Sequence, residues 1–507
     1  MTISLISCVT NFKNKLAIGR SNGLLFHFKN DLKFFQNITT NNLDANSKMD
    51  RNVVIMGENT WNSLPVKYRP LPNRINIILT RNKKLMSKFN YLYNNEVNFE
   101  KKKEGTTLFM DLDRFKKFYK KTNANVYVIG GGEVYNLFLN NEDVNLRPKT
   151  LYLTEVKNAK FDKDSEPTIF MDCPDESYKL ISVSEKHTEV SNGQTLDYRF
   201  LMYRRFDGYR SEEHKYLDLM KDILENGNER SDRTGTGTIS KFGCQLRFDI
   251  SKSIPLLTTK RIPYRIILEE LLWMCRGDTS NIILQKKNVN IWNDNSTRKF
   301  LDSRGLYYDE NILGPCYGWQ WRFFNAPYSQ AFADTSKVDT SKIGGFDQLK
   351  YIEYLLKNDP FNRRIILSAW NPVQMDQMAL PPCHLLIQFY VEEINKEKYL
   401  SCIFYMRSSD TFLAENWNIN AYVTLTYILA IKSNMKPKEI IFNGGDCHIY
   451  KNHFEQVKEQ LKRECRPFPK LLLNESIKYK DWNEITDDLF EIVGYMPHST
   501  IKAPMAI

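Results

Sequence analysis

No stretch of this 507-residue sequence approaches the ~20 consecutive apolar residues that a membrane-spanning helix needs. The first residues, MTISLISCVTNFKNK, place a short apolar segment ahead of the first lysine, whereas a secretory signal has the basic residue first. We therefore expect no association with a membrane and no export from the cell.

The sequence also lacks the closely spaced cysteines of a disulfide framework or a zinc site. The nine cysteines are an odd number, lie far apart and include no CxxC pair. A disulfide-stapled domain and a zinc site are therefore not indicated. We expect a cytoplasmic protein that holds no metal. The positions are Cys8, Cys173, Cys244, Cys275, Cys316, Cys383, Cys402, Cys447 and Cys465.

Glycine and proline are few, at 22 and 19 residues, which excludes a collagen-like or low-complexity chain. Hydrophobic residues make up 42% and charged residues 26% of the sequence, which are the proportions of a globular protein. At ~150 residues per domain the length predicts roughly three domains, although two large ones fit equally well. No internal repeat and no proline- or serine-rich linker divides the chain.

Short β-type runs alternate with helical patterns over residues 1–206. We expect strands at 4–9, 52–56, 75–80, 126–129, 150–156 and 197–204. We expect helices at 31–37, 111–121 and 132–140, and polar surface insertions at 38–51 and 82–105. Strands with crossover helices predict an α/β fold with a mixed, mostly parallel sheet.

Beyond a polar junction at 207–213 the pattern changes to longer helices, expected at 214–225, 264–275 and 419–433. We therefore expect a second domain at 214–507. The net charge of +11 is distributed unevenly between the two parts. Residues 1–206 contain 32 basic and 22 acidic residues, and residues 207–507 contain 39 and 38. The excess in the first part favours small anionic ligands there and argues against a nucleic-acid surface on the second.

Three local features stand out in the first part. The segment IGGGEVYNLF places three glycines between a strand and a helix, where bare amides could approach a phosphate or simply form a tight connection. Asp31 is an acid among apolar and aromatic residues, and is either an acceptor for a heterocycle or an ordinary helix-start acid. The segments VVIMGENTWNSLP and RPLPNRINIILTR end two strands with polar residues.

Together with SLISCV, AIGRSNGLL, NDLKFF and LYLTEV, these segments resemble dihydrofolate reductase over nearly all of residues 1–206. The resemblance implies NADPH-dependent reduction of 7,8-dihydrofolate, in which Asp31 binds the pterin and assists protonation at N5 while hydride reaches C6. It implies a folate site at Ile6, Asp31, Leu32, Phe35, Leu64, Leu71, Arg74 and Thr154. Arg74 would bind the glutamate α-carboxylate, and Thr154 would bond to Asp31. It implies an NADPH site at Ile18, Gly19, Gly57, Thr60, Thr80, Arg81, Gly131, Gly132, Glu133 and Val134.

Two positions depart from that family's usual pattern. Leu25 and Phe26 stand where Pro-Trp is usual, so the usual indole NH is not expected. Glu58 stands where a basic residue is frequent, and we expect it to repel a 2′-phosphate and to leave Arg81 with more of the preference for NADPH.

In the second part, Cys383 follows a double proline in LPPCHLLIQFY. A buried structural cysteine is one interpretation. The other is a nucleophile, because the arginines of RTGTGT, NRRIILSAW and YMRSSD could stabilise a thiolate or bind a phosphate, unless they are merely solvated. These segments, with LLTTKR, EELLWMCRGDT, IWNDN, LGPCYGWQWR, NGGDCHIYKNH and IKAPMAI, resemble thymidylate synthase across residues 214–507.

That resemblance implies reductive methylation of dUMP by 5,10-methylenetetrahydrofolate, with Cys383 adding to C6 of the uracil. Arg233, Arg407 and Ser408 would bind the phosphate, and Arg363 and Arg364 would reach it from the other subunit of a homodimer with a dimer-forming sheet. Glu270 would organise a proton relay. The further residues implied are Tyr317, Trp292 and Asn293 around the cofactor and nucleophile, His384 nearby, Asp410 and Asn418 at the pyrimidine or folate ring, His448 and Tyr450 at the ribose, and Lys260 at the folate glutamate tail.

The segment YMRSSDTFLAENWNINAY departs from this family's pattern at Met406, Ala414 and Asn416-Trp417, so the loop that presents Asn418 is expected to shift. One chain with both parts resembles the bifunctional dihydrofolate reductase–thymidylate synthases of protozoa, with an α/β first domain and an α+β second domain. Two alternatives remain open at this point. Either half could have lost its activity, or the basic chain could also bind RNA, although no RNA-binding motif is visible.

Overall fold

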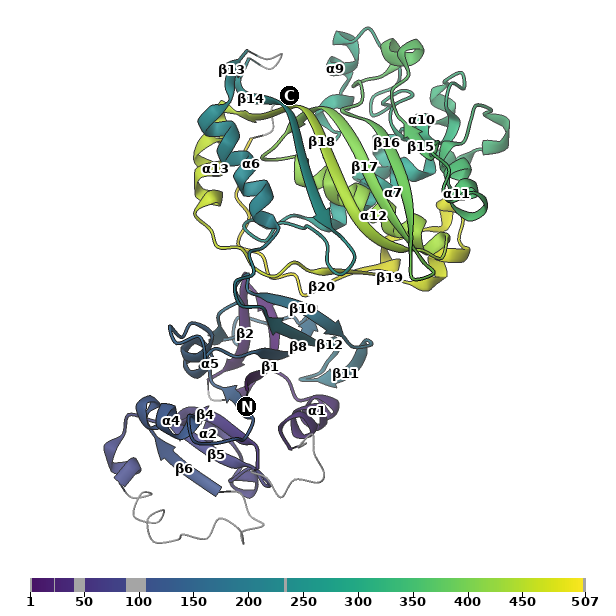
Figure 1. Ribbon diagram of the computed structural model, residues 1–507. Helices are drawn as coiled ribbons and strands as arrows, with labels where there is room; N and C mark the ends of the chain where they lie inside the picture. The colour runs from purple at the N-terminus through teal and green to yellow at the C-terminus, as the bar shows by residue number, and fades with distance from the viewer. Residues whose placement is uncertain (1, 22, 41–50, 88–105, 232–234, 505–507) are drawn as a thin grey trace. The chain divides into compact units, whose positions relative to one another are not determined.

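The computed structural model describes residues 2–21, 23–40, 51–87, 106–231 and 235–504 (Figure 1). The chain divides into two compact units, Met1–Arg210 and Ser211–Ile507. Each unit has its own sheet and hydrophobic core, and each combines strands with helices. The predicted two-domain α/β architecture is confirmed.

A mixed sheet forms the centre of the first unit. The central strands run in the order β8-β1-β7-β4-β5-β6 and are parallel, while β12 and β10 continue one edge in the antiparallel direction. The strands are β1 (Ile3–Phe12), β2 (Lys15–Arg20), β3 (Gly23–Leu24), β4 (Val53–Gly57), β5 (Ile75–Leu79), β6 (Thr106–Met110), β7 (Val126–Gly130), β8 (Thr150–Lys157), β9 (Ile169–Met171), β10 (Tyr178–Val183), β11 (His187–Ser191) and β12 (Gln194–Arg205).

Helices connect the parallel strands, as βαβ units require. They are α1 (Lys29–Thr40), α2 (Glu58–Ser63), α4 (Leu112–Tyr119) and α5 (Gly132–Leu139). Helix α4 begins where the side chain of Asp111 accepts a hydrogen bond from the Arg114 amide at 2.8 Å, which satisfies one free N–H of its first turn.

The surface insertions predicted at 38–51 and 82–105 were partly wrong. Residues 41–50 and 88–105 lie outside the described residues. Residues 38–40, however, continue α1, and Thr39 is fully buried because Arg74 and Asn52 donate hydrogen bonds to it. Met86 is buried as well. Sparse apolar residues suggested a surface position, but hydrogen bonds allow these polar groups to be buried. Strands β2, β3, β6, β9, β10 and β11 were not predicted.

The second unit contains a sheet in the order β13-β14-β18-β17-β16-β15. The strands are β13 (Asn228–Arg230), β14 (Thr238–Asp249), β15 (Ile366–Ser368), β16 (His384–Ile394), β17 (Glu397–Asp410), β18 (Lys436–Tyr450), β19 (Lys470–Leu473) and β20 (Phe490–Val493). The helices are α6 (Glu213–Asn226), α7 (Tyr264–Arg276), α8 (Asn281–Gln285), α9 (Arg298–Ser303), α10 (Gly318–Phe323), α11 (Gln348–Asn358), α12 (Glu415–Lys432) and α13 (Phe454–Leu461).

Helix α12 lies against one face of this sheet, at β17 and β18, and α7 packs against α12 (Figure 1). Helix α12 begins at Glu415, four residues earlier than the predicted start at Ile419. Asn416, which stands where the family usually has proline, is buried and donates from Nδ2 to the carbonyl of Pro255 at 2.9 Å. That bond holds the first turn of the helix, which therefore includes Asn418. The expected shift of the segment that presents Asn418, relative to the family's usual arrangement, stays a prediction.

Candidate active sites

Asp31 lies in the first turn of α1, opposite strand β8. Thr154 of β8 donates from Oγ1 to Asp31 Oδ1 at 2.5 Å, so the expected contact is present. Burial raises the pKa of the Asp31 carboxyl, Thr154 opposes that rise, and Glu189 adds to it. A carboxyl that holds its proton more tightly than usual can donate that proton to a bound substrate.

Apolar residues predicted for the folate site lie on either side of α1. Phe35, Leu64 and Leu71 belong to one hydrophobic cluster. Ile6 is buried on β1, and its carbonyl accepts a hydrogen bond from Tyr135 Oη at 2.7 Å. Leu32 is 53% exposed, so it offers an apolar surface beside Asp31.

Arg74 is a buried cation, 3% exposed. Its Nη1 donates to Thr39 Oγ1 at 2.7 Å and its Nε donates to the Pro72 carbonyl at 3.0 Å. Burial lowers the pKa of Arg74 to about 10. Within the described parts of the chain no carboxylate forms an ion pair with it. A buried guanidinium with no acid beside it suits an anionic group of a ligand.

Residues predicted to hold NADPH meet at the carboxyl ends of β4, β5 and β7, which are parallel neighbours. A Cβ atom on Gly57 would lie 3.2 Å from Val134 Cγ2, and one on Gly131 would lie 3.2 Å from Thr60 Oγ1. Both glycines therefore pack closely against neighbouring side chains at the strand ends, which is where α/β folds bind nucleotides. Thr80 and Arg81 follow the end of β5.

Gly132 and Gly19 serve close packing. A Cβ atom on Gly132 would lie 2.3 Å from the carbonyl oxygen of Phe170, and one on Gly19 would lie 2.8 Å from that of Gly23. Both would also approach Ile169 of β9 within 3.4 Å. Strand β9 therefore brings Ile18 and Gly19 of β2 close to the start of α5. Gly132 supports the interpretation of the glycine segment as a tight connection, and phosphate binding there stays a prediction. Glu133 is exposed on that helix.

The departures in this half have structural explanations. Thr80 donates from Oγ1 to Glu58 Oε2 at 2.8 Å, so a hydrogen bond holds this acid beside the predicted NADPH residues. Leu25 and Phe26 are both buried in an apolar cluster with Phe28 and Tyr198. The Phe26 and Phe28 rings are stacked with their centroids 5.6 Å apart.

Cys383 lies at the start of β16 and touches Arg407 of β17. Arg407 Nη2 is 3.8 Å from Cys383 Sγ, and the same guanidinium donates to the carbonyls of Pro381 and Pro382 at 3.0 and 2.8 Å. The Arg407 amide also donates to the Cys383 carbonyl at 2.9 Å. The double proline thus holds the arginine beside the thiol, and a fixed cation stabilises a thiolate.

Aromatic residues surround the amide side of Cys383. The Cys383 N–H donates to Tyr317 Oη at 2.8 Å, and the Tyr317 ring stacks on His384 with centroids 4.2 Å apart. The Oη of Tyr422 and His384 Nδ1 form a hydrogen bond. Burial lowers the pKa of His384 to about 3, so the imidazole is neutral near pH 7.

Glu270 of α7 completes this group. Trp292 donates from Nε1 to Glu270 Oε1 at 2.8 Å, and the Trp292 ring lies edge-on to Tyr317 with centroids 5.9 Å apart. Burial raises the pKa of Glu270 to about 7, while the Trp292 bond opposes the rise. A carboxyl that titrates near 7 can both accept and donate a proton. Asn293 is held by amide bonds from Asn281 and Gln285.

The carboxyl end of β17 lies beside β18. Asp410 pairs in register with His448, and Ser408 pairs with Asp446. Asp446 Oδ1 lies 3.4 Å from His448 Nδ1. The rings of His448 and Tyr450 are 5.1 Å apart. Ser408, Asp410, His448 and Tyr450 were all predicted from the sequence, and the sheet brings them together.

Other predicted residues lie differently. Arg233 is outside the described residues. Arg363 and Arg364 are exposed, and neither forms an ion pair with a carboxylate of the described segments. The side chain of Lys260 is buried, donates to the Phe412 carbonyl and lies 3.7 Å from that ring. Its expected contact with the folate glutamate tail stays a prediction. Burial lowers the pKa of Lys260 to about 7. Asn418 donates to the Ala414 carbonyl within its own helix at 3.1 Å.

Comparisons with known proteins agree with this geometry. Residues 3–205 match the dihydrofolate reductase family, and residues 214–507 match the thymidylate synthase family. A bifunctional dihydrofolate reductase-thymidylate synthase from Zea mays is 38% identical, with 97% of this chain and 95% of the relative covered. One from Plasmodium chabaudi is 37% identical, with 99% of this chain and 90% of the relative covered. The chain belongs to the bifunctional dihydrofolate reductase–thymidylate synthase family.

The family carries out NADPH-dependent reduction of 7,8-dihydrofolate and methylation of dUMP by 5,10-methylenetetrahydrofolate, so this member has both enzymatic activities. The thymidylate synthase family is generally dimeric. None of the helices in the described ranges has the length and apolar character needed to cross a bilayer.

Three residues near the candidate synthase site were not predicted from the sequence. They are Tyr422, Asp446 and Glu415. Tyr422 and Glu415 lie on α12, and only the packing of α12 against β17 and β18 brings them close. Asp446 could have been found, because it lies two residues before His448 in NGGDCHIY.

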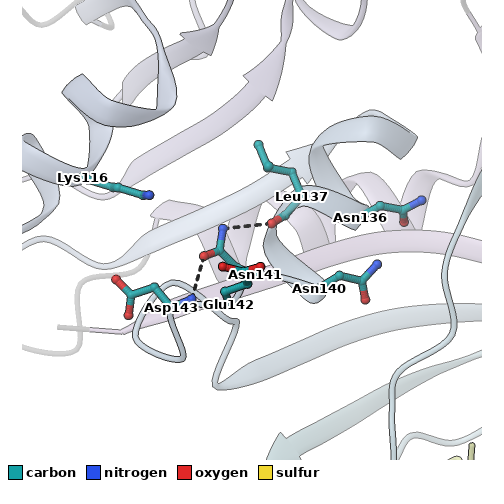
Figure 2. A pocket seen from close by; sticks show the side chains of 7 residues that line it. All are labelled: Lys116, Asn136, Leu137, Asn140, Asn141, Glu142 and Asp143. Carbon is teal, nitrogen blue, oxygen red and sulfur yellow. Dashed lines mark hydrogen bonds between the residues drawn. The ribbon is translucent and has the colours of Figure 1, made fainter.

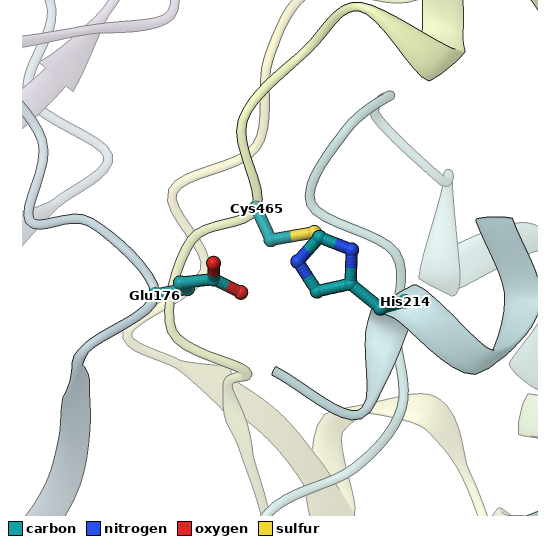
Figure 3. Close-up of side chains that lie close together, drawn as sticks. All are labelled: Glu176, His214 and Cys465. Carbon is teal, nitrogen blue, oxygen red and sulfur yellow. The ribbon is translucent and has the colours of Figure 1, made fainter. Parts of the chain in front are cut away.

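Two further features hold none of the predicted site residues. A pocket in the first unit is lined by Lys116, Asn136, Leu137, Asn140, Asn141, Glu142 and Asp143 (Figure 2). In the second unit, a ring nitrogen of His214 lies within 4.8 Å of the buried Cys465 Sγ (Figure 3).

Proposed function

We propose that Asp31 is the catalytic acid of dihydrofolate reduction and Cys383 the nucleophile of dUMP methylation. The observation that carries the second assignment is the guanidinium of Arg407 at 3.8 Å from the Cys383 thiol. The assignment of Asp31 is supported by its burial beside apolar residues, which raises the pKa of its carboxyl.

In the reductase half, bound NADPH would supply the hydride that reaches C6. Asp31 binds the pterin ring and helps to deliver a proton to N5, and Thr154 keeps its carboxyl oriented. Arg74 pairs with the α-carboxylate of the glutamate. Because no carboxylate of the described chain neutralises Arg74, the ligand's anion would do so.

The NADPH residues fit a phosphate-bearing ligand, since Gly57 and Gly131 lack side chains at the strand ends and Arg81 is exposed. The negative charge of Glu58 does not suit a phosphate-bearing ligand. Its bond to Thr80 keeps the acid in place, so we propose that Arg81 provides the attraction for a 2′-phosphate.

In the synthase half, the Cys383 thiolate bonds to C6 of the uracil, and the displaced electron pair makes C5 a nucleophile. C5 attacks the methylene carbon of the folate, C5 then loses its proton, and the bond between the methylene carbon and the folate's N5 breaks to release tetrahydrofolate, while Glu270 moves protons near O4. Hydride from that tetrahydrofolate adds to the methylene carbon and completes the methyl group as the C6–S bond breaks, and dTMP and dihydrofolate leave. That dihydrofolate is the substrate of the reductase half.

Ser408, Asp410, His448 and Tyr450 are proposed to hold the pyrimidine, phosphate and ribose of dUMP, with Arg233 and Arg407 on the phosphate. Two exposed arginines, Arg363 and Arg364, would reach the phosphate bound by a second copy. They require a homodimer.

An exposed apolar sheet face supports that homodimer. Leu386 and Tyr405 are paired neighbours on β16 and β17 and are 45% and 38% exposed, whereas α12 packs on the opposite face. Ile366 of β15, 37% exposed, continues the same face. Apolar side chains gathered on one sheet face are typical of a protein interface.

None of the nine cysteines, all of which lie in the described segments, forms a disulfide, and this is in keeping with the cytoplasmic location that we propose. We also propose residues 1–206 and 214–507 as the two catalytic domains, joined through 207–213.

The test of the function is to measure NADPH oxidation with dihydrofolate and dTMP formation from dUMP separately, on one preparation. Both rates should be present, and a missing one would overturn the assignment of that half.

A further inference from the structure

Glu415 is a buried acid that the reaction steps above do not use. It is the first residue of α12, and its relative exposure is 0%. Its Oε2 accepts hydrogen bonds from Ser409 Oγ and Thr411 Oγ1, each at 3.1 Å. Its Oε1 has no hydrogen-bond partner among the described residues.

The titratable groups that interact electrostatically with Glu415 carry no positive charge. They are Asp410 at the end of β17, Cys244 on β14, Cys447 on β18 and Tyr216 on α6. No lysine or arginine in the described chain forms an ion pair with it. An ionised carboxylate would therefore be buried without compensation, and burial raises the pKa of Glu415 to about 8.

The two hydroxyls that Glu415 binds flank the proposed nucleotide residues. Side chains alternate along a strand, so the bond to Ser409 leaves Ser408 and Asp410 pointing away from Glu415. Asp410 Oδ1 accepts from the amides of Phe412 and Leu413 at 3.0 Å each and closes the turn. The Thr411 amide donates to the His448 carbonyl at 2.9 Å, which ties this turn to β18.

We propose that Glu415 is a positioning residue of the synthase site, which as a neutral acid binds Ser409 and Thr411 and so directs Ser408 and Asp410 toward dUMP. This inference rests on the proposed function, because it takes Ser408 and Asp410 as nucleotide-binding residues.

Glu415→Gln and Glu415→Leu test it as a matched pair. Glutamine keeps a neutral acceptor for both hydroxyls, so the Kd and KM for dUMP should stay within about twofold of wild type. Leucine leaves two buried hydroxyls unpaired, and we expect both constants to rise by about tenfold while kcat changes less. Thr411→Val, which removes one donor at nearly constant volume, should raise both by about threefold. Thermal melting identifies the variants that fold. If Glu415→Leu does not fold, the affinity of Thr411→Val for dUMP tests the inference instead.

Binding of dUMP at different pH separates a positioning acid from a merely structural one. As the pH rises from 7 to 9 the wild-type carboxyl ionises and repels Asp410 and the dianionic nucleotide, so the wild-type Kd should weaken more than that of Glu415→Gln. A constant ratio of the two Kd values would overturn the neutral-acid role. Unchanged affinity in Glu415→Leu and Thr411→Val would overturn the inference alone, whereas a wild-type chain that does not bind dUMP would overturn the proposed function as well.

Discussion

Arg407 shows how a single residue changes the chemistry of another. Its guanidinium is held by two proline carbonyls and has one nitrogen 3.8 Å from the Cys383 thiol. A cation held in that place favours the thiolate, which is the reactive form of cysteine. The eight other cysteines, by contrast, have no assigned chemistry.

Cys383→Ser should abolish dTMP formation and leave dihydrofolate reduction intact. Serine keeps the size of the side chain, but its hydroxyl does not ionise near neutral pH and adds poorly to C6. Both rates are measured on the same preparation. Loss of both in a folded chain would contradict two separate sites.

Asp31→Asn should have the opposite effect. The amide keeps the hydrogen bond to Thr154 but has no proton to deliver, so the rate of NADPH oxidation should fall by roughly 10²-fold or more. The wild-type rate should also fall as the pH rises through the raised pKa of Asp31, because the protonated form is then lost. A variant that keeps the same pH dependence would show that another group provides the proton.

Glu270 gives a prediction about stability. Burial raises the pKa of Glu270 from 4.5 to about 7. The buried, protonated carboxyl therefore contributes stability to the folded state at acid pH, and this contribution is lost as the pH rises through about 7. Glu270→Gln stays neutral, and relative to wild type its free energy of unfolding should increase between pH 5 and pH 8 by up to ~3 kcal/mol. Urea unfolding at the two pH values measures it. If the free energies of unfolding of Glu270→Gln and wild type differ by the same amount at both pH values, Glu270 is not a buried carboxyl that titrates between them.

At the scale of elements, the start of α5 depends on Gly132. An alanine Cβ there would lie 2.3 Å from the Phe170 carbonyl oxygen, a backbone atom that cannot rotate away. Gly132→Ala should therefore destabilise the reductase half by about 1–3 kcal/mol and raise the KM for NADPH. Gly23→Ala is the control, since its Cβ would meet nothing closer than 3.6 Å. Equal melting temperatures of the two variants would refute the contact.

At the scale of the whole molecule, the proposed homodimer would form through the exposed face of the second sheet. Leu386→Glu places a charge on that apolar face and should convert the dimer to monomers, with loss of dTMP formation because Arg363 and Arg364 no longer reach the other site. Dihydrofolate reduction should persist. Analytical ultracentrifugation measures the mass. Tyr307→Glu changes a residue that is 93% exposed between α9 and α10, and it should leave the mass unchanged.

The distribution of charge also belongs to this scale. The excess of 10 positive charges lies in residues 1–206, and residues 207–507 are nearly balanced. That favours attraction of NADPH and folates to the reductase half and gives no support to RNA binding by the synthase half.

The sequence by itself predicted the fold class of both halves and, through the motifs that resemble two enzyme families, their reactions, because those motifs are local in the chain. It also pointed to Asp31 and Cys383, whose roles remain proposals. Only the tertiary structure placed Arg407 on Cys383, turned Lys260 inward and buried Glu415 under the end of β17. Those contacts join residues on different strands and helices, so they depend on sheet register and helix packing. Buried polar groups such as Thr39 escape pattern reading for the same reason, since their hydrogen-bond partners come from distant segments.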